Sequence, residues 1–211
     1  MFGYRGGVTP TTRRVETGHG PARVHVHPAH DARGGVLLGH GAGGGVDAPD
    51  LVAVTAALVT DGWTIALVEQ PYRAAGRKAP PRAPVLDAAW CDVVADLRAA
   101  ELAGLPVVAG GRSAGARVAC RTAEAVGAVG VVCLAFPTQP PGRPDAPSRV
   151  PELGTAVPVL VVQGATDPYG RPPEAHGRTV RVVRGDHSLR QDTAAVADAV
   201  RAWLDALVPR R

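Results

Sequence analysis

Short apolar runs along the chain alternate with longer stretches in which apolar residues recur every three or four positions. The short runs predict strands and the longer stretches predict helices, because side chains repeat every two residues along a strand and every 3.6 residues along a helix. The strands expected from this pattern are residues 23–28, 35–38, 63–68, 105–109, 129–134, 157–163 and 179–183. The helices expected are residues 51–61, 85–102, 113–125 and 193–207. This alternation indicates an α/β fold, with a mainly parallel twisted sheet and helices on both of its faces.

The length of 211 residues fits one domain, which we expect to extend over residues 1–211. Residues 2–20 are rich in glycine, threonine and arginine, so the first 20 residues are expected to be loosely ordered, with one short edge strand. The insertion between the strands 129–134 and 157–163 is too short and too rich in proline to form a helical cap domain. We therefore expect an open and shallow site.

Two proline-rich stretches, residues 71–84 and 137–151, predict loops. Substrate choice is expected to depend on both of them. Asp47 or Asp50 is expected to cap the helix over residues 51–61, since aspartate is a favoured N-cap residue.

Composition and charge exclude several classes of function. The net charge is +4, but the arginines are scattered and Lys78 is the single lysine, so we expect no nucleic-acid partner. No apolar run approaches the length of a membrane span, and residues 1–14 lack the apolar core of a secretory signal. Three cysteines, Cys91, Cys120 and Cys133, are expected to be free thiols in a reducing compartment. These observations predict a cytoplasmic protein.

Residues 111–115 read Gly-Arg-Ser-Ala-Gly, directly after an apolar run and before a helical pattern. This G-x-S-x-G pattern between a strand and a helix is typical of a nucleophile elbow. Glycine is needed two residues before and two after the serine, because a Cβ there would crowd the adjacent backbone. The pattern makes Ser113 a candidate nucleophile, and the alternative is an ordinary helix N-cap.

An aspartate and a histidine follow two later strands. Asp167 comes after the run 157–163 in Gly-Ala-Thr-Asp-Pro, and His187 comes after the run 179–183 in Gly-Asp-His-Ser. Open α/β sheets place their chemistry at the carboxyl ends of the strands, so Asp167, His187 and Ser113 are expected at one edge. Asp186 is the rival acid; Asp167 is preferred because the ring of His187, next to Asp186 in the chain, is expected to point away from it. The alternative for His187 is an ordinary loop histidine, and the alternative for Asp167 is an Asx turn.

The order Ser, Asp, His at successive strand ends is the order that α/β-hydrolases use. Over residues 24–207 the chain resembles this superfamily, and within it the small, cap-less, dienelactone-hydrolase-like predicted hydrolases. The resemblance lies in the G-x-S-x-G, G-A-T-D-P and G-D-H-S segments. It implies an α/β-hydrolase fold without a large cap and an activity that needs no cofactor.

A serine hydrolase would use these residues in defined roles. Ser113 would be the nucleophile, His187 the general base, and Asp167 the group that orients the imidazole. The oxyanion that forms on the substrate needs backbone donors. We expect these from the amides of Ala114, in the elbow, and Ala42, in the glycine-rich loop after the strand 35–38. The amide of Gly41 is the alternative to that of Ala42.

The loop after the strand 63–68 is strongly basic. The cations of this loop are Arg73, Arg77, Lys78 and Arg82, and Arg112 lies within the elbow. Arg73 and Arg112 are therefore candidate substrate-binding residues, on the hypothesis that the acyl group of the substrate carries a carboxylate. Gly41 is a third candidate, because glycine lets the backbone come close to the substrate. The alternative is a solvated basic loop.

Two other kinds of site are weaker alternatives. Gly39-x-Gly41-x-x-Gly44 matches a dinucleotide fingerprint, and Glu69 ends the next strand. However, residues 45–50 delay the helix and add two aspartates near the position of the phosphates, which disfavours a nicotinamide-dependent oxidoreductase. A second set, His25, His27 and His30, lacks a carboxylate or cysteine at matching spacing, so no metal site is expected.

The sequence therefore predicts a serine hydrolase that forms an acyl-enzyme intermediate. Carboxylic esters are the expected substrates, with thioesters, amides and lactones left open. The alternative from another class is a non-catalytic α/β-hydrolase scaffold that serves as an interaction module, because a fold does not determine a function. A small-molecule ester is the expected partner, and no membrane partner is expected. The oligomeric state is left open between a monomer and a homodimer.

Overall fold

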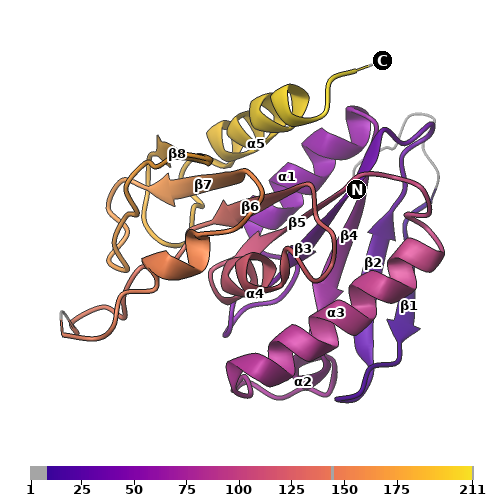
Figure 1. Ribbon diagram of the computed structural model, residues 1–211, viewed down its shortest axis with the longest axis horizontal. Coiled ribbons are helices and arrows are strands. Elements are labelled where there is room, and N and C mark those ends of the chain that lie inside the picture. Colours follow the sequence, from indigo (N-terminus) through magenta and orange to yellow (C-terminus); the bar gives the residue numbers. More distant parts are fainter. Residues whose placement is uncertain (1–8, 144, 211) are drawn as a thin grey trace.

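The sheet follows the alternating pattern of the sequence. A computed structural model describes residues 9–143 and 145–210, and the strands of this part of the chain form one sheet in the order β1-β2-β4-β3-β5-β6-β7-β8 (Figure 1). The strands are β1 (Thr11–Val15), β2 (Ala22–His27), β3 (Gly34–Gly39), β4 (Trp63–Glu69), β5 (Val107–Arg112), β6 (Gly130–Leu134), β7 (Val159–Gly164) and β8 (Arg178–Val183). Strands β1, β2 and β4 pair antiparallel, and every other pair is parallel.

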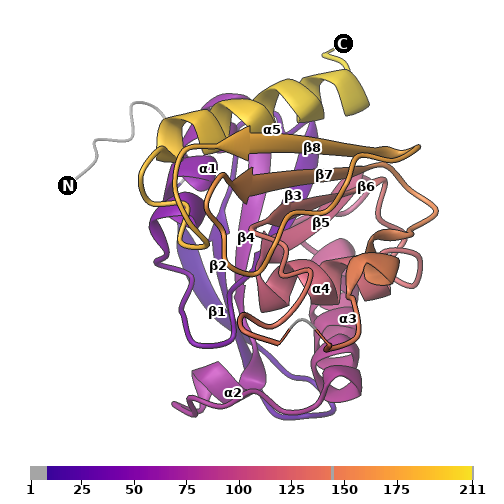
Figure 2. The same cartoon turned by 90° about the vertical axis from the view of Figure 1, so that its left-hand side faces the viewer.

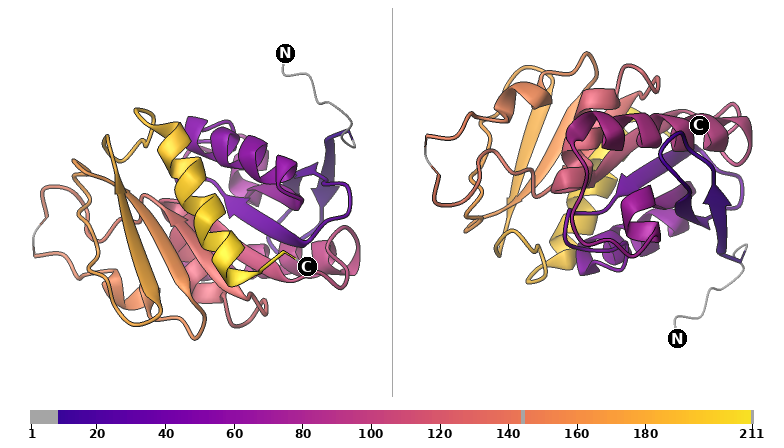
Figure 3. Two further views of the ribbon diagram at one scale, coloured as in Figure 1. Left: turned by 90° about the horizontal axis from the view of Figure 1, so that it is seen from above. Right: turned by 90° about the horizontal axis from the view of Figure 1, so that it is seen from below.

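Helices cover both faces of this sheet, as the sequence predicts. The helices are α1 (Pro49–Thr60), α2 (Pro71–Ala74), α3 (Ala83–Ala99), α4 (Ala114–Thr122) and α5 (Thr193–Leu207), with a 3₁₀ turn η1 (Val150–Leu153). Helices α1 and α5 pack on one face and α3 and α4 on the other (Figures 2 and 3). Successive strand residues alternate between the two cores. On β5, for example, Val107 and Ala109 face α3 and α4, whereas Val108 faces α1 and α5. The central parallel strands are consequently buried on both faces.

Most expected elements are present with small shifts at their ends. The helix expected over 193–207 is α5, and the edge strand expected within residues 2–20 is β1. Residues 1–8 of that segment lie outside the described part of the chain. Between β6 and β7 the described residues form a loop with η1 and no helical layer over the strand ends, as expected for a hydrolase fold without a cap (Figure 2).

Two local predictions are wrong. Neither Asp47 nor Asp50 caps α1: the N-cap residue is Ala48, its side chain makes no cap hydrogen bond, and Asp50 is buried instead. Residues 71–84 are not all loop, since they contain α2 and the start of α3. Both helices have proline in the first turn, where the missing N–H costs nothing and the fixed φ favours helix.

Two further findings concern membrane spans and cysteines in the described part of the chain. None of the helices in this part is long and apolar enough to cross a membrane. Among the described residues all three cysteines are free, with Cys120 and Cys133 buried side by side, their Sγ atoms 3.4 Å apart.

Candidate active site

Ser113 stands at the turn between the end of β5 and the start of α4. Its backbone has φ +52° and ψ −106°, a conformation that L-residues rarely adopt and that costs about 1–3 kcal/mol. Its amide donates to the carbonyl oxygen of Leu134 on the neighbouring strand β6, at 2.9 Å. Its side chain makes no cap hydrogen bond to α4. Ser113 thus occupies the N-cap position of α4, but its hydroxyl does not cap the helix and is free to face another partner.

The glycines around Ser113 are required by a close backbone contact with β3. A Cβ on Gly111 would lie 2.6 Å from the carbonyl oxygen of Gly39, and one on Gly115 would lie 2.4 Å from the same atom. Such distances are shorter than any real Cβ contact, so larger residues would push the elbow away from β3. The glycine spacing of the sequence pattern thus has the steric cause that was expected.

The structure brings Ser113, His187 and Asp167 together from three strand ends. The Nε2 atom of His187 lies 3.0 Å from the hydroxyl of Ser113, and the Nδ1 atom lies 2.8 Å from Oδ2 of Asp167. The Asp167 side chain is 1% exposed and that of His187 is 18% exposed. Because a carboxylate only accepts, Nδ1 carries the proton toward Asp167 and Nε2 can accept the hydroxyl proton of the serine.

Asp167 is held in place by two groups that the sequence analysis did not identify. Its Oδ2 accepts from Nε2 of Gln163 at 2.7 Å, and its Oδ1 accepts from the backbone N–H of Tyr169 at 2.8 Å. The ring of Tyr169 also packs on the His187 ring, with centroids 4.1 Å apart. Gln163 is fully buried near the end of β7. A glutamine within the apolar run Val-Leu-Val-Val-Gln-Gly was the available signal, because a buried polar side chain needs partners.

Asp186 faces away from the imidazole. Its carboxylate accepts from the backbone N–H of Ser188 at 2.8 Å and from the hydroxyl of Ser188 at 2.6 Å, and these hydrogen bonds lower the pKa of Asp186. It is exposed to solvent. The structure therefore places Asp167, and not Asp186, against the His187 ring.

Residues 40–42 lie against the elbow. A Cβ on Gly41 would be 3.7 Å from Cβ of Ser113. The buried ring of His40 donates from Nδ1 to the carbonyl oxygen of Gly41 at 2.7 Å and accepts at Nε2 from the backbone N–H of Gln70 at 3.1 Å. Burial lowers the pKa of His40, which keeps the ring neutral, as these two bonds require. The hydroxyl of Tyr72 donates to the carbonyl oxygen of Ala42 at 3.0 Å and holds the loop from another side.

Arg112, within the elbow, is paired with a buried carboxylate. Its Nε atom donates to Oδ2 of Asp50 at 3.0 Å, and one terminal nitrogen donates to the carbonyl oxygen of His187 at 2.6 Å. Asp50 is fully buried, and this burial raises its pKa against the opposing effect of Arg112. The guanidinium thus joins the elbow, α1 and the loop that follows β8 and contains His187 (the histidine loop), instead of facing the solvent. Arg73, in α2, forms no ion pair with a described residue, and its positive charge contributes to the lowered pKa of His40.

Replacing Arg112 by methionine is expected to lower the free energy of unfolding by about 3–5 kcal/mol at pH 7, because Asp50 would be left buried without a cation. Without Arg112 the pKa of Asp50 would rise further, so the loss should shrink as the pH falls toward 4 and the carboxyl takes up a proton. Urea unfolding at both pH values measures this. The double variant Asp50→Leu/Arg112→Met should recover most of the stability. A single variant as stable as the wild type would contradict the pairing.

The geometry does not favour the two weaker alternatives, a dinucleotide site at residues 39–44 and a metal site at the N-terminal histidines. Helix α1 begins at Pro49, several residues after the glycine turn of residues 39–44, so its N-terminus does not lie on that turn as pyrophosphate binding requires. His25 lies against Glu69, and His30 pairs with Asp31. Among the described residues, no three histidines, cysteines, aspartates or glutamates are grouped so that they could hold a metal ion.

The family comparison fits this architecture. The family model for the alpha/beta hydrolase domain matches residues 32–205, which is most of the chain. The chain belongs to the α/β-hydrolase family. The matched segment contains the elbow, the aspartate turn, the histidine loop and the loop of residues 40–42. No curated protein shows a significant sequence match to this hydrolase.

Solved structures with the same fold cover nearly the whole of this α/β hydrolase. An alpha-beta serine hydrolase homologue from Coxiella burnetii has a TM-score of 0.73 at 14% identity, with 92% of this chain and 98% of that chain covered. A lidless serine hydrolase from Xanthomonas campestris has a TM-score of 0.70 at 20% identity, with 96% of each chain covered. Dienelactone hydrolase from Anabaena variabilis has a TM-score of 0.68 at 19% identity, with 92% and 94% covered. At these identities the similarity shows the fold alone.

Proposed function

We propose that this α/β hydrolase is a serine esterase in which Ser113 is the nucleophile, His187 the general base and Asp167 the orienting acid. The observation that carries the proposal is the unbroken series of contacts from the Ser113 hydroxyl through both ring nitrogens of His187 to Asp167. Each residue comes from the end of a different parallel strand. Three separate loops must therefore come together to form these contacts. A serine that only caps a helix and a histidine in an ordinary loop would not need such an arrangement.

The mechanism follows from the direction of these hydrogen bonds. The Ser113 oxygen attacks the ester carbonyl carbon while its proton passes to Nε2 of His187, and Asp167 stabilises the resulting imidazolium. The tetrahedral intermediate collapses, the C–O bond to the alcohol breaks, and His187 gives the proton to the leaving oxygen. Water then attacks the acyl-enzyme with His187 again as base, which releases the acid and restores the serine.

The amides of Ala114 and Ala42 are the proposed donors to the oxyanion. Ala114 directly follows the nucleophile at the first residue of α4, and Ala42 lies in the loop that contacts the elbow through Gly41. The hydrogen bonds of Gly41 and Ala42 to His40 and Tyr72 use their carbonyl oxygens. Their amide N–H groups form no hydrogen bond with a described residue. The Gly41 amide stays the alternative donor. Each such donor is worth about 10²–10³ in rate.

Small carboxylic esters are the proposed substrates. One solved structure with this fold is described as Est1E from Butyrivibrio proteoclasticus with ferulic acid bound, and its TM-score is 0.77 at 14% identity. Arg73 stays a candidate contact for a carboxylate on the acyl group, because it has no ion-pair partner among the described residues. Thioesters and lactones share the reacting carbonyl and fit the same mechanism. The cytoplasmic location and the choice between monomer and homodimer stay predictions.

Hydrolysis of p-nitrophenyl acetate tests the proposal. We expect an initial burst of p-nitrophenol close to one equivalent per protein chain, followed by slower turnover, because acylation by an activated ester outpaces deacylation. The same burst is expected from Asp186→Asn, since that carboxylate does not contact the ring. Release no faster than in buffer would favour the alternative of a non-catalytic scaffold.

A further inference from the structure

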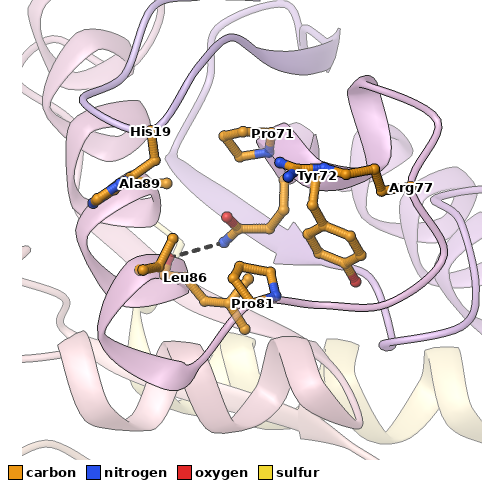
Figure 4. Close-up of a pocket in the computed structure, with 9 residues that line it drawn as sticks. His19, Pro71, Tyr72, Arg77, Pro81, Leu86 and Ala89 are labelled. Carbon is orange, nitrogen blue, oxygen red and sulfur yellow. Dashed lines mark hydrogen bonds between the residues drawn. The ribbon is translucent and has the colours of Figure 1, made fainter.

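A pocket opens at the end of β4, next to the loop of residues 40–42. It has a volume of about 230 Å³ and is formed by α2, the following loop and the start of α3, with His19 opposite (Figure 4). Its apolar wall consists of Pro71, Tyr72, Pro81, Val85, Leu86 and Ala89. None of the residues that line it belongs to the Ser113–His187–Asp167 group or to residues 40–42. The pocket is therefore distinct from the place where the ester carbonyl would lie.

One buried polar atom in the lining of this pocket lacks a partner. Gln70 is 6% exposed, and its Nε2 atom donates to the carbonyl oxygen of Leu86 at 3.1 Å, which fixes the orientation of the amide. Its Oε1 atom is buried and accepts no hydrogen bond from a described residue. A buried acceptor without a donor is unfavourable, and native proteins rarely leave one. A ligand with an O–H or N–H group would satisfy it.

One side of the pocket rim is cationic. Arg77 is exposed at one side and His19 at the other (Figure 4). Neither the guanidinium of Arg77 nor the charges of its loop neighbours Lys78 and Arg82 form an ion pair with a described residue. The charges are therefore available to an anion, and a guanidinium suits a carboxylate through its fork of N–H donors.

Two hydrogen bonds between side chain and backbone link the pocket to the proposed oxyanion loop. The hydroxyl of Tyr72 donates to the carbonyl oxygen of Ala42, while the backbone N–H of Gln70 donates to the ring of His40. Both residues that support the loop thus also line the pocket. A ligand that holds Gln70 and Tyr72 in place would also hold in place the loop that contains the Ala42 amide.

We propose that this pocket is a second ligand site for a small organic anion that has an apolar body and one hydrogen-bond donor. The apolar body packs against the prolines and Leu86, the donor reaches Oε1 of Gln70, and the carboxylate faces Arg77. The three parts of the ligand correspond to the three parts of the pocket: apolar wall, buried acceptor and cationic rim. The site requires no chemistry at Ser113.

Calorimetric titration of the full chain with 4-hydroxyphenylacetate tests the site, because this probe carries all three features. We expect saturable binding of one molecule per chain. The matched probe 4-methoxyphenylacetate, which lacks the donor, should bind about tenfold more weakly. Arg77→Ala should weaken the hydroxy probe about fivefold, whereas Lys78→Ala, at the adjacent residue that does not line the pocket, should change its affinity less than twofold.

The Ser113→Ala variant separates this proposal from the esterase proposal. Binding of 4-hydroxyphenylacetate should be unchanged in it, whether or not the wild type hydrolyses esters. Absence of binding, equal affinity for the two probes, or equal effects of Arg77→Ala and Lys78→Ala would overturn the second site. Binding that is lost when Ser113 is substituted or covalently modified would place the probe in the candidate active site instead and would overturn it too.

Discussion

Replacing Ser113 by alanine is expected to lower kcat for p-nitrophenyl acetate by at least about 10³-fold, because no other hydroxyl of the described residues occupies the position 3.0 Å from Nε2 of His187. KM should change little, since the reacting oxygen contributes more to the transition state than to binding of the ester. Fold and stability should be retained, because alanine and serine have similar steric requirements at the positive φ of this turn. Initial rates over a range of ester concentrations measure both constants.

Ser188→Ala is the matched control for this experiment. Ser188 carries the same hydroxyl in the same loop as His187, but its side chain donates to Asp186 and not to the imidazole. Its substitution should leave kcat within about twofold of the wild type, the range expected for a surface change away from the chemistry. Equal rates for the wild type and the folded Ser113→Ala variant would show that another group performs the reaction.

Asp167→Asn is expected to lower kcat by about 10³–10⁴-fold with the protein still folded. The asparagine amide can donate to Nδ1 of His187, and that bond would favour the tautomer with its proton on Nε2, where the serine proton must go. A carboxylate also stabilises the imidazolium that forms during attack, and a neutral amide does not. The kcat values of the variant and the wild type, measured with the same ester, give this factor.

Asp186→Asn provides the comparison that identifies the acid. Both variants replace a carboxylate by an amide in loops next to His187, yet only Asp167 contacts the ring. We expect near wild-type kcat from Asp186→Asn. If Asp186→Asn lost activity and Asp167→Asn did not, the acid would be misassigned and the histidine loop would have to rearrange.

Local patterns in the sequence predict much of the fold and of the site. Helix α5 could be placed to the residue because its apolar residues repeat with the helical period over its whole length. Ser113, His187 and Asp167 could be proposed together because parallel strands bring their carboxyl ends to one edge of the sheet. The glycines at 111 and 115 could be predicted from sterics, and the contact of both with Gly39 shows the crowding that requires them.

Contacts between distant residues could not be predicted in this way. Arg112 and Asp50 are 62 positions apart, and nothing in the local sequence of either indicates the other. Asp50 near a helix start is typical of a cap, and only the fold shows that its carboxylate is buried against a guanidinium. Gln163 is a similar case, since its hydrogen bond to Asp167 depends on the turn after β7.

The most direct test of the proposed nucleophile is labelling of the folded protein with a fluorophosphonate, followed by mass spectrometry of its peptides. The geometry around Ser113 predicts one adduct per chain, located on Ser113, and no adduct in Ser113→Ala. Ser188→Ala should be labelled like the wild type. Absence of labelling in the folded wild-type protein, or an adduct that persists in Ser113→Ala, would contradict the assignment of Ser113 as the nucleophile of a serine hydrolase.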